Sequence, residues 1–146
     1  MSQAVRAIII ENNNLLLASR NKEGNQYFTL VGGRIKDQET KLQALQRKVK
    51  EETGLDIVNA QLVFIEDHPE PYSQQYIYLC HVDQHGELRV LESSEEAYLN
   101  TIGLDLHQPI WSPVNGFATL PFRTPQLKDA IVDALKSGFP SQPIKL

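Results

Sequence analysis

Apolar and polar residues alternate at the start of the chain in a way that predicts β-structure. Residues 5–10 form a largely β-branched run, and residues 15–19 form a second apolar run. A polar turn cluster at residues 11–14 separates the two runs, which favours a β-hairpin. A third strand is predicted for residues 26–31, which lead into the paired glycines 32–33.

The apolar spacing changes after these glycines and predicts an α-helix over residues 40–53. Asp37 or Thr40 is expected to cap its first turn. Gly54 is expected to end the helix in the left-handed conformation, which glycine adopts without steric strain.

Polar residues are unevenly distributed around the axis of this helix. Three apolar residues share one face, which is expected to pack on the sheet: Leu42, Leu45 and Val49. Glu52 lies beside that face, with Lys48 and then Glu51 farther round. Two carboxylates near the edge of a core repel each other unless a cation joins them, and oxygen ligands suit Mg²⁺. Arg47 lies one helical turn before Glu51 and is expected to orient its carboxylate.

The remainder of the chain continues as a mixture of strands and one more helix. Strands are predicted for residues 57–66, 75–82 and 110–114. Residues 125–136 have the apolar spacing of an amphipathic helix, and the tail at residues 138–146 is expected to be irregular. Strands interspersed with two helices predict an α/β or α+β sandwich. We expect the whole chain to form a single domain.

Composition narrows the range of partners and locations. The chain has 146 residues and a formal net charge of −4, which argues against a nucleic-acid polymer, because its binders present a basic face to the phosphate backbone. No apolar run approaches membrane-spanning length. The single cysteine, Cys80, suits a reducing compartment. We therefore expect a cytoplasmic protein without a membrane partner, and leave open whether it forms a homodimer.

Residues 33–55 carry the most specific pattern in the chain. They resemble the signature of the Nudix hydrolase family, G-x(5)-E-x(7)-R-E-U-x-E-E-x-G-U, in which U is a bulky aliphatic residue. Eight of the nine specified positions match: Gly33, Glu39, Arg47, Val49, Glu51, Glu52, Gly54 and Leu55. The ninth is Lys48, which stands where the family has a glutamate of the catalytic centre.

This resemblance implies an α/β/α sandwich with a mixed β-sheet between helices. It also implies divalent-metal-dependent hydrolysis of a diphosphate linkage in a nucleoside diphosphate derivative. By position, Glu51 and Glu52 would ligate Mg²⁺ or Mn²⁺, and the carbonyl of Gly33 would add a ligand. Arg47 and Glu39 would orient these carboxylates, which makes these four charged side chains the implied catalytic residues.

Lys48 puts this implied chemistry in question. A lysine here removes an oxygen ligand or general base, and its ammonium repels a divalent ion. A replacement base could come from Glu95 or Glu96, although a solvated loop is the favoured interpretation of the acidic stretch at residues 92–96. Alternatively, Lys48 would bind phosphate directly beside the backbone of Gly32 and Gly33. That alternative describes a catalytically impaired nucleotide-binding or regulatory protein.

The loop before the helix also departs from the family pattern. Relatives commonly read P-G-G-x-x-E-x-G-E, whereas Val31, Lys36 and Gln38 stand at the proline, the first glutamate and the last glycine of that pattern. Substrate choice would depend on loops such as residues 68–75 and 92–106. The sequence does not give their conformations.

Overall fold

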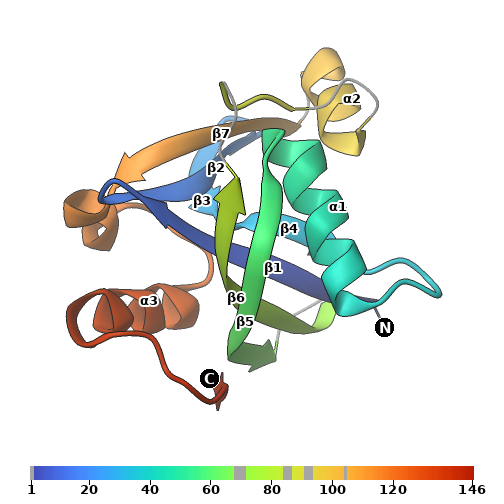
Figure 1. Ribbon diagram of the computed structural model, residues 1–146. Helices are drawn as coiled ribbons and strands as arrows, with labels where there is room; N and C mark the ends of the chain where they lie inside the picture. Colours follow the sequence, from blue (N-terminus) through green and yellow to red (C-terminus); the bar gives the residue numbers. More distant parts are fainter. Residues whose placement is uncertain (1, 68–71, 84–86, 91–93, 104) are drawn as a thin grey trace.

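The computed structural model describes residues 2–67, 72–83, 87–90, 94–103 and 105–146 (Figure 1). The strands form a mixed sheet, and helices lie on both of its faces. In chain order the elements are β1 (Ser2–Glu11), β2 (Asn14–Lys22), β3 (Asn25–Thr29), β4 (Val31–Arg34), α1 (Lys41–Thr53), β5 (Asp56–Asp67), β6 (Tyr72–Asp83), α2 (Glu95–Ile102), β7 (Asp105–Pro113), the 3-10 helix η1 (Val114–Thr119), α3 (Pro125–Ser137) and β8 (Ile144–Lys145).

The sheet follows the order β3-β2-β1-β6-β5-β8, with β4 also paired to β1 and β7 also paired to β2. β1 and β2 form the predicted hairpin, and Asn12 and Asn13 at its turn both have positive φ, as a two-residue type I′ turn requires. The two strands pair only beside this turn, at Ile10 with Leu15 and at Glu11 with Asn14. Farther along, β1 pairs with β4 and β6, whereas β2 pairs with β3 and β7. The sheet therefore divides into two parts that separate away from the hairpin.

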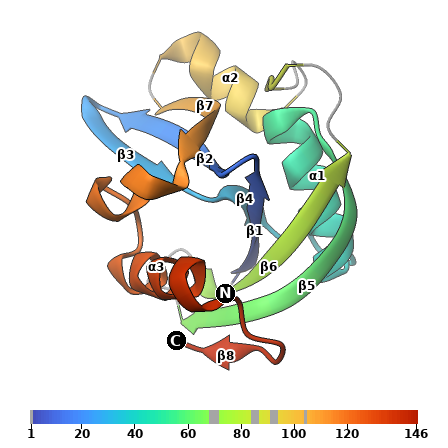
Figure 2. The same ribbon diagram turned by 60° about the vertical axis from the view of Figure 1, so that its left-hand side comes forward.

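Helices cover the two faces of the sheet, with α1 on one face and α3 on the other (Figure 2). Alternate residues of β1 supply both cores. Val5, Ala7 and Ile9 join the apolar cluster under α1, and Ile8 joins the cluster under α3. All four side chains are fully buried, which identifies β1 as a central strand. The expected sandwich with a mixed sheet between helices is confirmed.

Helix α1 begins and ends where the sequence predicts. Thr40 and Gln43 form a reciprocal capping box at its start, and Gly54 ends it in the left-handed conformation with φ of 79°. Its buried face differs from the prediction. Leu42 is 51% exposed, whereas Lys48 is only 5% exposed. The placement of Leu42 on the packing face was therefore wrong, and α1 instead turns a charged side chain toward the protein interior.

Three local predictions were wrong. Residues 26–31 do not form one strand, because the chain pairs first with β2 as β3 and then with β1 as β4. The segment 92–106, expected to be a loop, contains α2, whose start is capped by the side chain of Ser94. The tail is not wholly irregular, because β8 pairs parallel with β5. Residues 68–71, 92–93 and 104 of the two predicted loops lie outside the described residues.

Candidate functional site

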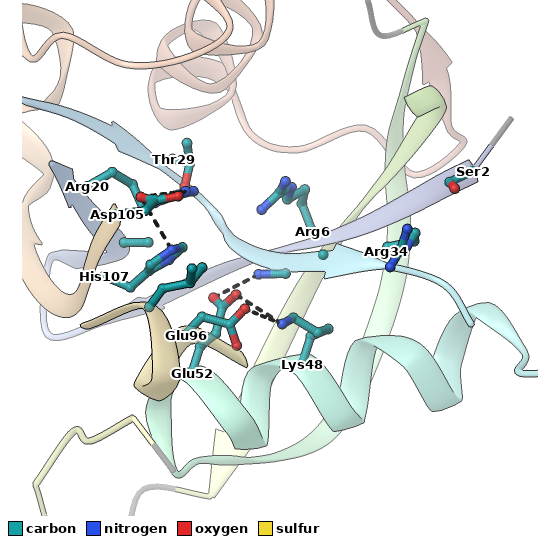
Figure 3. Close-up of a pocket in the computed structure, with 14 residues that line it drawn as sticks. Ser2, Arg6, Arg20, Thr29, Arg34, Lys48, Glu52, Glu96, Asp105 and His107 are labelled. Carbon is teal, nitrogen blue, oxygen red and sulfur yellow. Dashed lines mark hydrogen bonds and ion pairs between the residues drawn. The ribbon is translucent and has the colours of Figure 1, made fainter. Parts of the chain in front are cut away.

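A polar cavity of about 270 Å³ lies where β1 and β2 separate (Figure 3). Helices α1 and α2 border it on one side, and strands β1, β2, β3, β4 and β7 supply the rest of its wall. Its charged lining residues are Arg6, Arg20, Arg34, Lys48, Glu52, Glu96 and Asp105. Gly32 and Gly33 also line it, so the start of the sequence motif and the middle of α1 face one space.

Lys48 forms the centre of a buried group of charges in this cavity. Its Nζ donates a hydrogen bond to Oε2 of Glu96 at 2.6 Å. The same nitrogen lies 3.7 Å from Oε1 of Glu52 and 3.8 Å from Oε2 of Glu51. Lys48, Glu52 and Glu96 are all buried. The favoured interpretation of residues 92–96 as a solvated loop was therefore wrong for Glu96, which is the nearest carboxylate to Lys48.

The position of Glu96 depends on how α2 packs. Asn100 of α2 makes two hydrogen bonds to the backbone of His107 in β7, one through each atom of its side-chain amide. Ser94 accepts a hydrogen bond from the backbone of Ala97 and fixes the first turn of the helix. These contacts hold Glu96 over the cavity. The side chain of Glu95 lies outside the described part of the structure.

Gly32 brings the backbone of β4 close to α1, the helix within the signature (the signature helix). Its φ of +146° and a Cβ position only 2.0 Å from the carbonyl oxygen of Val5 leave no room for a side chain. Its N–H donates a hydrogen bond to Oε2 of Glu52 at 3.1 Å. Burial is the main reason that the pKa of Glu52 is raised to about 7, with Lys48 acting in the opposite direction.

Arg47 joins the loop before α1 to the helix itself. Its guanidinium donates to both oxygens of Glu39, at 2.7 and 2.9 Å, and to Oε1 of Glu51 at 3.1 Å. A further hydrogen bond reaches the carbonyl oxygen of Arg34 at 3.0 Å. The hydrogen bonds from Arg47 are the main reason that the pKa of Glu39 is lowered to about 2. The contact predicted between Arg47 and Glu51 is present, and Glu51 does not line the cavity.

Sequence reasoning missed the other end of the cavity. Arg20 pairs with both carboxylate oxygens of Asp105, at 2.9 and 3.1 Å, and Nε2 of His107 lies 3.4 Å from Oδ1 of Asp105. Burial is the main reason that the pKa of His107 is lowered. Arg6 also lines the cavity. A charged residue within an apolar strand pattern, as Arg6 is, was the signal that could have located this surface.

Within the part of the chain that the structure describes, several buried polar atoms of the cavity lining have no hydrogen-bond partner. They are Nε of Arg20, Oγ1 of Thr29, Oε1 of Glu96 and Nε2 of His107, the last of which lies near Asp105 without hydrogen-bond geometry. Buried polar atoms are nearly always hydrogen-bonded in folded proteins. Their concentration around one cavity indicates a place for a polar ligand.

The fold and the cavity define a class of protein: an α/β/α sandwich in which a carboxylate-bearing helix and a pair of glycines border a charged pocket. Residues 1–123 match the family model described as NUDIX domain. A CTP pyrophosphohydrolase from Escherichia coli (strain K12) is 32% identical over 97 residues, which cover 63% of this chain and 70% of that protein. The chain belongs to the Nudix family.

Solved structures agree with this assignment at the level of the fold. A NUDIX hydrolase from Nitrosomonas europaea has a TM-score of 0.69 at 18% identity, covering 94% of this chain and 90% of that one. A MutT protein from Bacillus halodurans has a TM-score of 0.62 at 17% identity, covering 90% and 82% respectively. Family membership and the pyrophosphohydrolase relative support a hydrolase. No helix in the described ranges is long and apolar enough to cross a membrane.

Nudix hydrolases generally use divalent metal ions, but the donor set of this cavity does not fit one while Lys48 is in place. The ammonium already lies between Glu52 and Glu96. At an effective dielectric constant of about 20, the ammonium would repel each unit of positive charge on a second cation about 4 Å away by about 4 kcal/mol. Among the residues that the structure describes, no group of three or more His, Cys, Asp or Glu side chains is arranged to hold a metal ion. The metal-ligand roles of Glu51, Glu52 and Gly33 remain predictions.

Proposed function

We propose that this protein hydrolyses a diphosphate linkage in a nucleoside diphosphate derivative. The observation that carries the proposal is that one cavity brings Lys48 and Glu52 of α1 together with Gly32 and Gly33 of β4. Arg6, Arg20 and Arg34 line the same cavity, and guanidinium groups bind phosphate oxygens well. The CTP pyrophosphohydrolase relative makes CTP the first substrate to test.

Glu96 is our proposed general base. Its Oε2 is held by Lys48, while its Oε1 is buried at the cavity and has no hydrogen-bond partner among the described residues. In the proposed step, the oxygen of a water molecule attacks phosphorus as its proton passes to Oε1 of Glu96. The bond from that phosphorus to the bridging oxygen breaks, and the leaving phosphate keeps the bonding electrons. Lys48 and the arginines would stabilise the charge that develops on the phosphoryl oxygens. No step is assigned to a divalent ion, because the donor set does not fit one.

Product release from a substrate panel tests this function. The panel contains CTP and other nucleoside triphosphates, ADP-ribose, dinucleotide polyphosphates and nucleotide sugars. Each would be incubated in Mg²⁺, in Mn²⁺ and in EDTA. Glu96→Gln is expected to lower kcat by about a hundredfold or more, as the loss of a general base does, and Glu52→Gln is expected to lower it as well. Asp129→Asn makes the same chemical change on the exposed surface of α3 and should leave turnover unchanged.

A second function, binding of a nucleotide without turnover, is favoured by the presence of Lys48 among the carboxylates. Absence of product from every substrate, with a folded protein, would refute the hydrolase. Nucleotide-dependent increases in Tm under those conditions would then support the binding protein. The cytoplasmic location and a homodimer stay predictions.

A further inference from the structure

The side chain of Lys48 packs closely against the backbone of Gly33. A Cβ placed on Gly33 would lie 2.6 Å from Cε of Lys48 and 3.4 Å from its Nζ. The glycine therefore leaves just enough space for the lysine stem to pass from α1 to the cavity. The ammonium reaches the cavity wall in a fixed position rather than lying free at the surface.

This ammonium has hydrogen-bonding capacity to spare. A lysine has three N–H donors, and within the described residues Nζ of Lys48 makes one hydrogen bond, to Glu96. The carboxylates of Glu51 and Glu52, at 3.8 and 3.7 Å, lie beyond hydrogen-bond distance. Buried donors of this kind are normally satisfied. A ligand bearing acceptor oxygens would complete the coordination of Lys48.

The charges around the cavity favour an anionic ligand. Its lining contains four basic side chains and three carboxylates. Asp105 is paired with Arg20, and Glu96 with Lys48. Arg6 donates instead to neutral groups, the side chain of Gln75 and the carbonyl oxygen of Leu30. Positively charged hydrogen-bond donors therefore remain in the cavity beyond those used in its closest ion pairs.

We propose that Lys48 is a built-in cation for the diphosphate group, so that this cavity binds a diphosphate without a divalent ion. The inference rests on the proposed function in that it uses the same cavity and the same class of substrate. The ammonium of Lys48 would contact the diphosphate oxygens directly while Glu96 holds it in place. The lysine thus takes over part of the phosphate-neutralising role that the family gives to a metal ion.

Calorimetric titration with inorganic pyrophosphate in EDTA tests the lysine. Wild-type protein is expected to bind, and Lys48→Met to bind about ten- to a hundredfold more weakly, as the loss of a charged hydrogen-bond donor predicts. Lys50→Met is the matched control, because Lys50 lies on the same helix but is exposed and pairs with Asp56. Its affinity should equal that of the wild type. Equal affinity of Lys48→Met and wild type in EDTA, or no binding by the wild type, would overturn the proposal.

Direct binding of Mn²⁺, followed by its electron paramagnetic resonance signal, tests the metal side. Lys48→Glu returns a carboxylate to the site and is expected to bind Mn²⁺ at least about tenfold more tightly than the wild type. Lys50→Glu carries the same charge change and should not. Equal Mn²⁺ affinity of wild type and Lys48→Glu would count against the inference. If Lys48→Glu does not fold, the pyrophosphate titration of Lys48→Met decides the question alone.

These outcomes are separable from those of the hydrolase assay. Binding of pyrophosphate in EDTA that depends on Lys48, without turnover of any substrate, would retain the inference and reject the hydrolase. Turnover in Mg²⁺ or Mn²⁺, without pyrophosphate binding in EDTA, would retain the hydrolase and reject the inference.

Discussion

The buried pair of Lys48 and Glu96 makes a quantitative prediction about stability. Nζ and Oε2 are 2.6 Å apart and both side chains are 7% exposed. At an effective dielectric constant of about 20, two unit charges at this distance attract by about 6 kcal/mol. The cost of removing both ions from water offsets much of that attraction. We therefore expect a net coupling of about 3 kcal/mol between the two side chains.

A double-mutant cycle isolates this coupling. Glu96→Gln keeps the shape of the side chain and removes its charge, whereas Lys48→Met keeps most of the stem and removes the ammonium. Each single variant is expected to lose about 3 kcal/mol, because it leaves a buried charge without its nearest partner. Glu52, at 3.7 Å from Lys48, moderates the loss in Glu96→Gln. The double variant should lose no more than either single variant, about 3 kcal/mol.

Urea unfolding followed by circular dichroism measures these free energies, with the slope of each transition compared among variants. The exposed pair of Lys50 and Asp56 supplies the control cycle, with Lys50→Met and Asp56→Asn. Its coupling should be below about 0.5 kcal/mol, as for other surface ion pairs. If the losses from Lys48→Met and Glu96→Gln simply add, the buried ion pair does not contribute as the geometry implies, and our account of the cavity is wrong.

Three further predictions concern the signature region. Glu39, with a pKa lowered to about 2 by Arg47, adds stability that is present above about pH 4.5 and lost as pH falls toward 2. Glu39→Gln should remove this acid-dependent part of the free energy of unfolding, about 1 kcal/mol in urea titrations after allowance for solvent screening. Glu52 has a pKa raised to about 7, so between about pH 4.5 and 7 it keeps its proton in the folded protein but loses it in the unfolded chain, and stability falls as pH rises across that interval. The free energy of unfolding of Glu52→Gln, relative to wild type, should therefore rise by about 2 kcal/mol between about pH 5 and pH 8. A difference between the two proteins that does not change with pH would refute this. Gln38 has φ of 65°, a conformation that suits the glycine found there in relatives, so Gln38→Gly should raise stability by up to about 1 kcal/mol, measured as a higher Tm.

Elements defined by contacts between near neighbours could be predicted from the sequence. Thr40, Gln43 and Gly54 fix the two ends of α1 through hydrogen bonds and backbone conformations within a few residues. The hairpin of β1 and β2 depends on Asn12 and Asn13 in the same way. The short strand β8 and the division of residues 26–31 were not predictable, because both depend on pairing with strands distant in the sequence.

The contacts of the candidate site also divide into those between near neighbours and those between distant elements. The spacing of the signature placed Arg47 beside Glu51, because residues one helical turn apart are neighbours whatever the rest of the fold does. The contacts of Lys48 beyond its own helix were not determined locally. Glu96 is 48 residues farther along the chain, and it reaches Lys48 because α2 is held on β7 by hydrogen bonds between Asn100 and His107.

By itself, the sequence determined the family, the signature helix and the presence of a lysine where a catalytic glutamate is expected, since each is a property of residues at fixed spacing. Only the tertiary structure decided which groups that lysine contacts beyond its own helix. Its ammonium pairs with a carboxylate from another helix, and its stem packs against Gly33. Both relations arise from the packing of α1 against β4 and α2, and spacing along the chain does not specify packing between distant elements.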